Sequence, residues 1–240
     1  MRKFLFALLV TAVLPLGAAK LKLPELTGRV VDNANIFSTA EKEQIEAAIL
    51  QLEKATQGGQ MAVLTVKSLN GMPIEWYGIK LAEKWKIGQK GKDNGAILII
   101  ALNDRSMRLE IGYGWEGKVN DARAGDIIRE LVPYFQANKY GEGTAQAVMR
   151  VQEFVTGKPV EGLPPLKKSP RRQPAGSVLL IFLSIIAIAI LSGGRILIIP
   201  GFGGGFRGGG GFGGGGGFGG GGGFSGGGGG FGGGGSSGQW

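Results

Sequence analysis

The sequence predicts an α/β protein in which one β-sheet carries helices on both faces. Apolar residues at helical spacing alternate along the chain with short apolar runs, and one run, AILIIAL at 96–102, is apolar throughout. A continuous apolar run of this length is typical of a strand that is covered on both faces. These segments lie in residues 20–157, which carry 18 Lys/Arg against 17 Asp/Glu and have the size of one domain.

The first helix of this domain is predicted from a capping signal and an apolar stripe. Ser38 begins a capping box, S-T-A-E, in which a hydroxyl and a carboxylate bind the first backbone N–H groups of a helix. Ile45, Ile49 and Leu52 follow at helical spacing. An amphipathic helix is therefore expected to run to about Thr56.

The remaining elements are predicted from the same periodicities and from the turn residues between them. They are a strand at 61–67, a helix at 73–86, strands at 96–102 and 107–111, and helices at 121–136 and 144–155. Asn103 and Asp104 favour a turn, so the last two strands are expected to pair as an antiparallel hairpin. Arg108 and Glu110 alternate with apolar residues, which predicts that the second arm of the hairpin is half-exposed.

The flanking segments predict export and a membrane anchor. Residues 1–19 combine a basic start, an apolar run and small residues at Gly17 and Ala19, as a cleaved secretory signal does; an uncleaved anchor is the alternative. Residues 158–176, rich in Pro, Lys and Arg, are expected to be a linker. Residues 177–199 contain a charge-free apolar stretch that is long enough for a short single span, with an interfacial hairpin as the alternative. The domain is then expected on the periplasmic or extracellular side of the cell membrane, with the side of the tail left open.

Residues 200–240 form a low-complexity tail that contains 28 glycines and six phenylalanines. This composition predicts a disordered tether, or alternatively a weak, multivalent association surface that uses the phenylalanines. Because Arg207 is the only charged residue of the tail and the domain is nearly neutral, no nucleic-acid partner is expected.

The residue types that are missing exclude several kinds of active site. Without Cys and His there is no thiol nucleophile, no Ser-His-Asp triad and no ordinary zinc site. The segment 112–118 matches G-x-G-x-x-G, but Val119 stands where a Walker loop has Ser or Thr, and no helix holds the third glycine. A nucleotide cofactor is therefore not expected. Any bound metal has to be held by oxygen atoms, which favours Ca²⁺ or Mg²⁺.

Oxygen-bearing side chains gather at one end of the predicted hairpin. Asp93 and Asn94 precede its first strand, and Glu116 and Asp121 follow its second. The start of one antiparallel strand lies beside the end of the other, so these side chains are expected to be neighbours. Clustered carboxylates need a hard cation or a basic residue, which makes a Ca²⁺ or Mg²⁺ site one interpretation. A turn at Asp93 and a helix cap at Asp121 are the alternatives.

Several short motifs, in their order and spacing, resemble the TPM-domain family. They are GRVVDNA at 28–34, KDNGA at 92–96, Asp104-Arg105, and GYGWEG at 112–117 continuing to Asp121. The succession of signal peptide, such a domain, membrane span and Gly-rich end closing in Gly-Gln-Trp is similar to the YgcG-like membrane proteins of bacteria.

The resemblance implies a three-layer α/β/α sandwich, a divalent cation, and an accessory role beside membrane proteins. It assigns the cation to Asp93 and Asp121, with Asp32 and Glu116 as further contributors and Asn94 as a carbonyl donor. For some members it also implies acid phosphatase activity. Two hypotheses follow: an interaction module for membrane proteins, which we prefer, and a metal-dependent phosphatase. The second needs Lys92, Arg105 or Arg108 to hold the phosphoryl charge.

Overall fold

The computed structural model describes residues 23–166 and 224–240. The predicted signal peptide at 1–19 and the predicted membrane span at 177–199 lie outside the described residues, so both stay predictions. The same holds for most of the predicted linker and for the first part of the tail. Within the described ranges, no helix is long and apolar enough to cross a membrane.

The chain divides into two compact units. The first consists of residues 1–163 together with 223–240, and the second of residues 164–222, nearly all of which lie outside the described ranges. Every described helix and strand belongs to the first unit.

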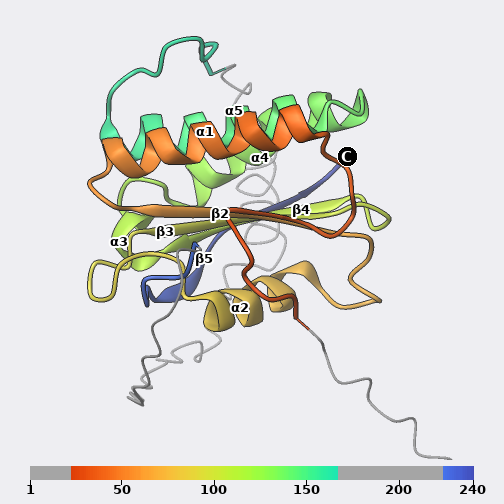
Figure 1. Cartoon of the computed structure of the whole chain (residues 1–240), viewed down its shortest axis with the longest axis horizontal. Coiled ribbons are helices and arrows are strands. Elements are labelled where there is room, and N and C mark those ends of the chain that lie inside the picture. The colour runs from red at the N-terminus through yellow and green to blue at the C-terminus, as the bar shows by residue number, and fades with distance from the viewer. Residues whose placement is uncertain (1–22, 167–223) are drawn as a thin grey trace, which may run out of the picture. The chain divides into compact units, whose positions relative to one another are not determined.

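A five-stranded mixed sheet forms the centre of the first unit (Figure 1). Its strands lie in sequence order across the sheet. The first three are parallel, and the fourth is antiparallel to both of its neighbours. The strands are β1 (Val30–Asp32), β2 (Gln60–Val66), β3 (Gly95–Ala101), β4 (Ser106–Gly112) and β5 (Phe231–Gln239).

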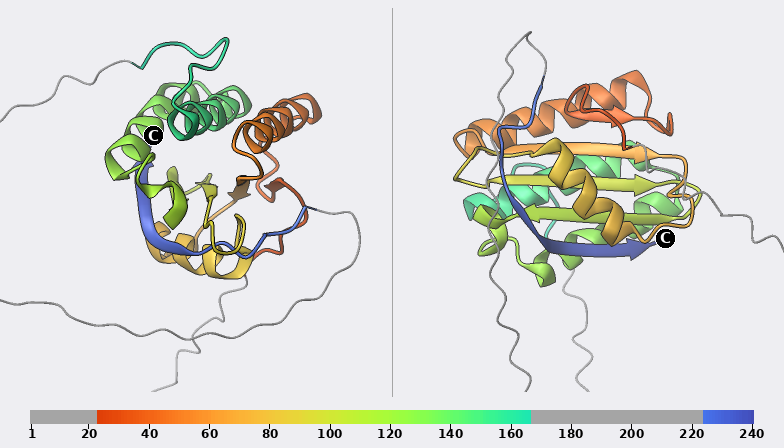
Figure 2. Two further views of the ribbon diagram at one scale, coloured as in Figure 1. Left: turned by 90° about the vertical axis from the view of Figure 1, so that its left-hand side faces the viewer. Right: turned by 90° about the horizontal axis from the view of Figure 1, so that it is seen from below.

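Helices cover both faces of the sheet, as Figures 1 and 2 show. Three long helices cover one face: α1 (Thr39–Ala55), α4 (Asp121–Gln136) and α5 (Tyr140–Thr156). The other face carries α2 (Ile74–Trp85), while the short α3 (Tyr113–Glu116) follows β4 directly. The chain is thus a three-layer α/β/α sandwich, which confirms the predicted fold class.

The apolar core has two layers because the side chains of each strand alternate between the faces of the sheet. Leu98 and Ile100 of β3 pack with the helices α1, α4 and α5, while Ile97 and Ile99 pack with α2. All four side chains are fully buried. The central strand is therefore covered on both faces, as its continuous apolar run predicted.

The predicted elements between residues 38 and 157 match the observed ones to within a few residues, and α4 has the predicted bounds. The largest difference concerns the tail. It was expected to be disordered, but its described part, residues 224–240, includes β5, which pairs antiparallel with β4. The right-hand view of Figure 2 shows β5 in blue along this edge. Glycines can form this strand because its ladder is made by backbone groups, which glycine shares with every other residue.

The predicted half-exposure of β4 was wrong. Arg108 is 5% exposed and Glu110 is fully buried. Both side chains lie on the α2 face of the sheet, where α2 and β5 cover them. The alternation in the sequence was correct, but α2 and the distant strand β5 cover the polar face of β4.

Candidate functional site

The strand β5 meets the rest of the unit at the residues that the sequence singled out as metal ligands. Oδ1 of Asp93 accepts a hydrogen bond of 2.8 Å from the backbone N–H of Gly230, and Oδ1 of Asp121 accepts one of 3.0 Å from Gly235. Glu116 lies against the same segment, because a Cβ on Gly234 would be 2.5 Å from its Oε1. Three of the predicted ligands thus contact the returning tail.

Of the alternative roles, a turn at Asp93 and a helix cap at Asp121, only the turn is observed. Asp93 adopts a left-handed conformation with φ 49°, as expected for a turn. The cap of α4, however, is Asn120, whose Oδ1 accepts a hydrogen bond from the N–H of Arg123. Asp121 is therefore the first residue of the helix and its carboxylate is available to bind Gly235.

Asn94 has a local structural role. Its Oδ1 accepts a hydrogen bond of 2.8 Å from the backbone N–H of Gln89, and its Nδ2 donates to Oε1 of the same residue at 3.1 Å. The side chain is 8% exposed. It closes the loop before β3, and its amide oxygen is already used there.

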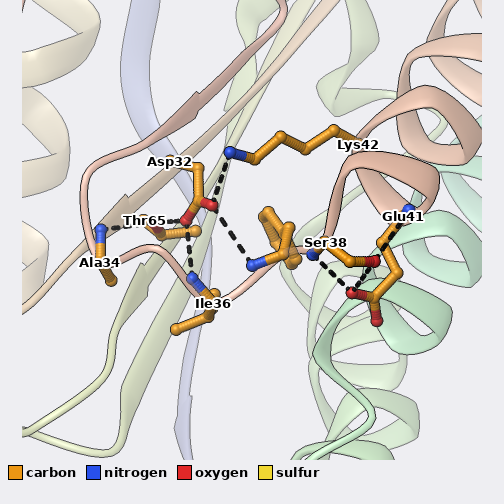
Figure 3. Close-up of polar contacts among 8 residues, drawn as sticks. Asp32, Ala34, Ile36, Ser38, Glu41, Lys42 and Thr65 are labelled. Carbon is orange, nitrogen blue, oxygen red and sulfur yellow. Dashed lines mark hydrogen bonds and ion pairs between the residues drawn. The ribbon is translucent and has the colours of Figure 1, made fainter.

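Asp32 was expected at the same site but lies at the opposite end of the sheet. It ends β1, whereas Asp93 precedes β3, which runs parallel to β1 and β2. Its carboxylate accepts hydrogen bonds from the N–H groups of Ile36 and Phe37 and from the hydroxyl of Thr65 (Figure 3). Lys42 adds an ion pair at 3.1 Å.

These partners also set the pKa of Asp32. Burial acts to raise the pKa of this carboxyl, but the hydrogen bonds from Thr65, Ile36, Lys42 and Phe37 outweigh burial and hold the pKa below its ordinary value. Asp32 therefore ties β1 to the start of α1 and does not join Asp93.

The five predicted ligands consequently do not form a single metal site. In the part of the chain that the structure describes, no three or more Asp, Glu, His or Cys side chains are grouped so that they could hold a metal ion. The carboxylates of Asp93 and Asp121 instead accept hydrogen bonds from glycine N–H groups. With β5 in place, the described residues do not fit a preformed Ca²⁺ or Mg²⁺ centre.

A buried ion pair lies beneath β5 and was not expected from the sequence. Nε of Arg108 donates to Oε1 of Glu110 at 2.5 Å. The tail supplies two further hydrogen-bond acceptors for the guanidinium. Nη1 donates to the hydroxyl oxygen of Ser237 at 3.0 Å, and Nη2 donates to the carbonyl oxygen of Gly233 at 3.2 Å. Burial raises the pKa of Glu110, and the hydrogen bond from Arg108 opposes that shift.

The hydroxyl of Ser237 also links this ion pair to α2. It forms a hydrogen bond with the carboxylate of Glu75, which lowers the pKa of Glu75 below its ordinary value. Space for the pair comes from Gly78 of α2, since a Cβ there would collide with Oε1 of Glu110. The tail thus supplies polar partners that two buried charges require.

An aromatic anchor fixes the far end of β5. The ring of Trp240 packs edge-to-face with Phe135, with 5.0 Å between ring centroids, and with Tyr140 at 6.2 Å. The backbone N–H of Trp240 donates to the carbonyl oxygen of Arg105 at 3.2 Å. Trp240 therefore joins the core layer that contains α4 and α5.

A family model for the TPM domain matches residues 30–154, which is more than half of the chain. The chain belongs to the TPM-domain family. A solution NMR structure of the N-terminal domain of a protein from P. gingivalis is similar to it, with 32% identity over 55% of this chain and 83% of that chain and a TM-score of 0.50. No curated protein matches.

Two further solution structures share 17% identity with this TPM domain. The N-terminal domain of the cg2496 protein from Corynebacterium glutamicum covers 62% of this chain and 95% of its own, with a TM-score of 0.44. The BA42 protein from Bizionia argentinensis covers 55% of this chain and 86% of its own, with a TM-score of 0.46.

The family match ends at residue 154, so β5 lies outside the matched TPM domain. The strand is nevertheless fitted closely to the domain. A Cβ on Gly235, whose φ is 139°, would collide with the carbonyl oxygen of Leu109, and a Cβ on Gly238 would collide with Ile128. The edge of β4, which β5 occupies between α2 and α4, is called the groove along β4, and it accepts an extended segment that lacks side chains at these positions.

The sequence pointed to Asp93, Glu116 and Asp121 but missed the other groups that hold β5. The missed residues are Glu75, Arg108, Ser237 and Trp240. One signal was present, because Ser236, Ser237 and Trp240 interrupt an otherwise Gly-rich tail. Their partners are about 100 residues or more away along the chain, so local patterns could not identify them.

Proposed function

We propose that this chain is an exported, membrane-tethered TPM domain that acts as an interaction module for membrane proteins. In this proposal the edge of β4 is the binding surface, and it takes up extended, Gly- and Ser-rich segments by strand addition. Strand addition is a common mode of peptide recognition, in which main-chain hydrogen bonds supply affinity and flanking side chains supply specificity. Export comes from residues 1–19 of the sequence. Residues 177–199 supply the tether as an interfacial hairpin, because a single span would put residues 224–240 on the opposite side of the membrane from the domain and prevent β5 from pairing with β4.

The observation that carries the proposal is the docking of β5. Its backbone pairs with β4 from Ser106 to Gly112. Side chains of the domain bind the backbone or the hydroxyl of the docked segment from both sides: Asp93 and Asp121 accept from N–H groups, and Arg108 donates to a carbonyl and to Ser237. Such contacts recognise an extended segment.

The phosphatase alternative is less well supported by the positions of its expected cationic groups. Arg108 is buried and engaged with Glu110. Lys92 precedes β3 and Arg105 follows it, so about 20 Å of strand separate these two residues at roughly 3.3 Å per residue. The three groups therefore cannot surround one phosphoryl group.

Cation binding enters the proposal only as a competitor of β5. Asp93 and Asp121 present carboxylate oxygens, which suit Ca²⁺ or Mg²⁺, but the same oxygens accept the N–H groups of Gly230 and Gly235. We therefore propose that a cation binds there more tightly when β5 has left. No step of the docking requires the cation.

A peptide titration tests the docking function. In the full chain, Gly235→Ala should release β5, because the new Cβ would collide with Leu109. The synthetic peptide 224–240 is then expected to bind this variant with saturation in isothermal titration calorimetry. Amide hydrogen exchange of residues 231–239 confirms the release.

Gly230→Ala is the matched control for this experiment. A Cβ at Gly230 meets its nearest atom, Oδ1 of Asp93, at 3.5 Å, which is an ordinary contact. The control chain should keep β5 docked and should not bind the peptide. The proposal would be contradicted by a folded Gly235→Ala chain whose β5 amides have lost protection from hydrogen exchange and which still does not bind the peptide.

A further inference from the structure

We propose that the groove along β4 also accepts β5 of a second copy of this chain, so that copies are linked by strand exchange. The inference rests on the proposed docking function and names the occupant: residues 224–240 of another copy. Exchange of an identical element between copies is a low-cost route to assembly, because every contact in the exchanged state already exists in the closed one.

The first argument is the connection between the domain and the tail. The hydrogen bonds and ring contacts of residues 224–240 are made with groups that lie between residues 29 and 140, whereas the tail reaches them through residues 167–223. A chain of that length can span up to roughly 190 Å at about 3.3 Å per residue. The docking contacts do not depend on which copy supplies the segment, and the connection is long enough to reach a neighbour.

The second argument is selectivity. The groove excludes a Cβ at Gly235 and at Gly238, needs a hydroxyl where Ser237 binds Arg108, and receives an indole beside Phe135. A segment that satisfies all four conditions is present in every copy of this chain. A second copy is therefore the partner whose chemistry is known to match the groove.

The third argument is the weak attachment of β5 compared with the central strands. Ordering consecutive glycines costs more conformational entropy than ordering any other residue type. Only Phe224, Phe231 and Trp240 bring large apolar side chains to the docked segment 224–240, and all three are partly exposed. Elements with few buried apolar contacts open more readily than the core of a domain. Opening is the step that exchange requires.

Tethering would favour exchange further. With residues 177–199 anchored as an interfacial hairpin, which leaves domain and tail on the same side of the membrane, copies are confined to one plane, and the effective concentration of a neighbouring tail rises without any new contact. Reciprocal exchange between two copies gives a closed dimer, and one-way exchange gives an open chain of copies.

Engineered cysteines test the proposal, since the natural chain contains none. Ser106 and Gln239 are register partners across β4 and β5. Full-length Ser106→Cys is mixed in equal amounts with full-length Gln239→Cys that carries a mass tag, and the mixture is mildly oxidised. Strand exchange predicts a disulfide-linked heterodimer of the two variants on a non-reducing gel, because each chain holds only one of the two partners.

Two controls make the result decisive. Gln51→Cys, exposed on α1, replaces Ser106→Cys as a partner that the register does not bring to Gln239, and it should give at most one tenth of the heterodimer. A single chain with both Ser106→Cys and Gln239→Cys should form an internal disulfide, which reports that β5 docks as described.

The outcomes separate the two proposals. Heterodimer from the Ser106 and Gln239 variants, above the Gln51 control, supports exchange. An internal disulfide in the double variant without heterodimer in the mixture overturns exchange and leaves the docking function intact. Equal heterodimer in both mixtures also overturns exchange, because the link would then not depend on register. No disulfide in the double variant, neither within a chain nor between two copies, overturns the docking itself.

Discussion

The strands β3 and β5 belong to one sheet, but different interactions hold them in place. Every residue of β3 is buried, and its apolar side chains fill both core layers. Most residues of β5 are glycines that fit because they have no side chain. The central strand is held mainly by burial of apolar area, while the edge strand is held by backbone hydrogen bonds and by a few side chains at fixed places.

This difference shows that a glycine run can be a specific element of a fold. A glycine strand has weakly specified register, because few side chains distinguish one alignment from the next. In β5 the register is fixed by Ser237, which binds Arg108, and by Trp240, which packs on Phe135. The carboxylates of Asp93 and Asp121 add two hydrogen bonds, which they accept from backbone N–H groups of the docked segment.

The largest effect is expected from truncation of the central strand. Leu98→Ala removes a fully buried side chain from β3 and should lower the free energy of unfolding by about 3 kcal/mol through lost burial and the cavity left behind. Urea unfolding of the full chain measures the change. Leu50→Ala on α1, at a side chain that is 41% exposed, is the control and should change stability by less than about 0.5 kcal/mol.

A smaller and local effect is expected from the anchor of β5. Trp240→Ala removes two edge-to-face contacts and should weaken docking by about 1–2 kcal/mol, so that the amides of 231–239 exchange roughly tenfold faster. Trp76→Ala, at an exposed side chain of α2, should leave this exchange unchanged. Equal protection of β5 in both variants would show that backbone pairing alone holds the strand.

Cation titration sharpens the comparison further. If the carboxylates of Asp93 and Asp121 are shared between β5 and a cation, Ca²⁺ should bind the Gly235→Ala chain about fivefold more tightly than the unchanged chain, a coupling of about 1 kcal/mol. Calorimetry measures both affinities, with Asp93→Asn in the Gly235→Ala background as control. Equal affinity in the two chains would separate the cation from the docked strand.

The smallest effect is expected from pH. The hydrogen bond from Ser237 lowers the pKa of Glu75 in the folded chain, so this carboxylate stabilises docking above its ordinary pKa of 4.5, and the contribution is lost as pH falls through the lowered value. Glu110 acts in the opposite direction. Its pKa is raised by burial, so its cost to stability grows as pH rises from 4.5.

Exchange of β5 amides measured between pH 6 and roughly pH 3 isolates the contribution of Glu75 when the unchanged chain is compared with Glu75→Gln. The difference in protection should be present at pH 6 and shrink toward acid. A difference that grows toward acid would mean that the Ser237 contact does not depend on the ionised carboxylate.

Most of the fold could be predicted from the sequence because its helices, strands and turns depend on patterns of residues that are close together along the chain. The apolar run of β3, the helical spacing of Ile45, Ile49 and Leu52, and the turn at Asn103 all have local physical causes. The three-residue strand β1 was missed since so short a segment, Val30–Asp32, shows no period. The candidate site was found in part, because antiparallel pairing of β3 and β4 correctly placed Asp93 near the end of the other strand.

What the sequence determined by itself is the TPM domain, its sheet and its helices, since apolar periodicity and capping act over a few residues. The tertiary structure alone decided what the oxygen atoms of Asp93 and Asp121 bind, why Arg108 and Glu110 are buried, and that the Gly-rich end is a strand. These features depend on contacts between β5 and groups that lie about 100 residues or more away along the chain, or on glycines that fit because they lack a Cβ. The pattern of hydrophobic residues in the sequence contains neither kind of information.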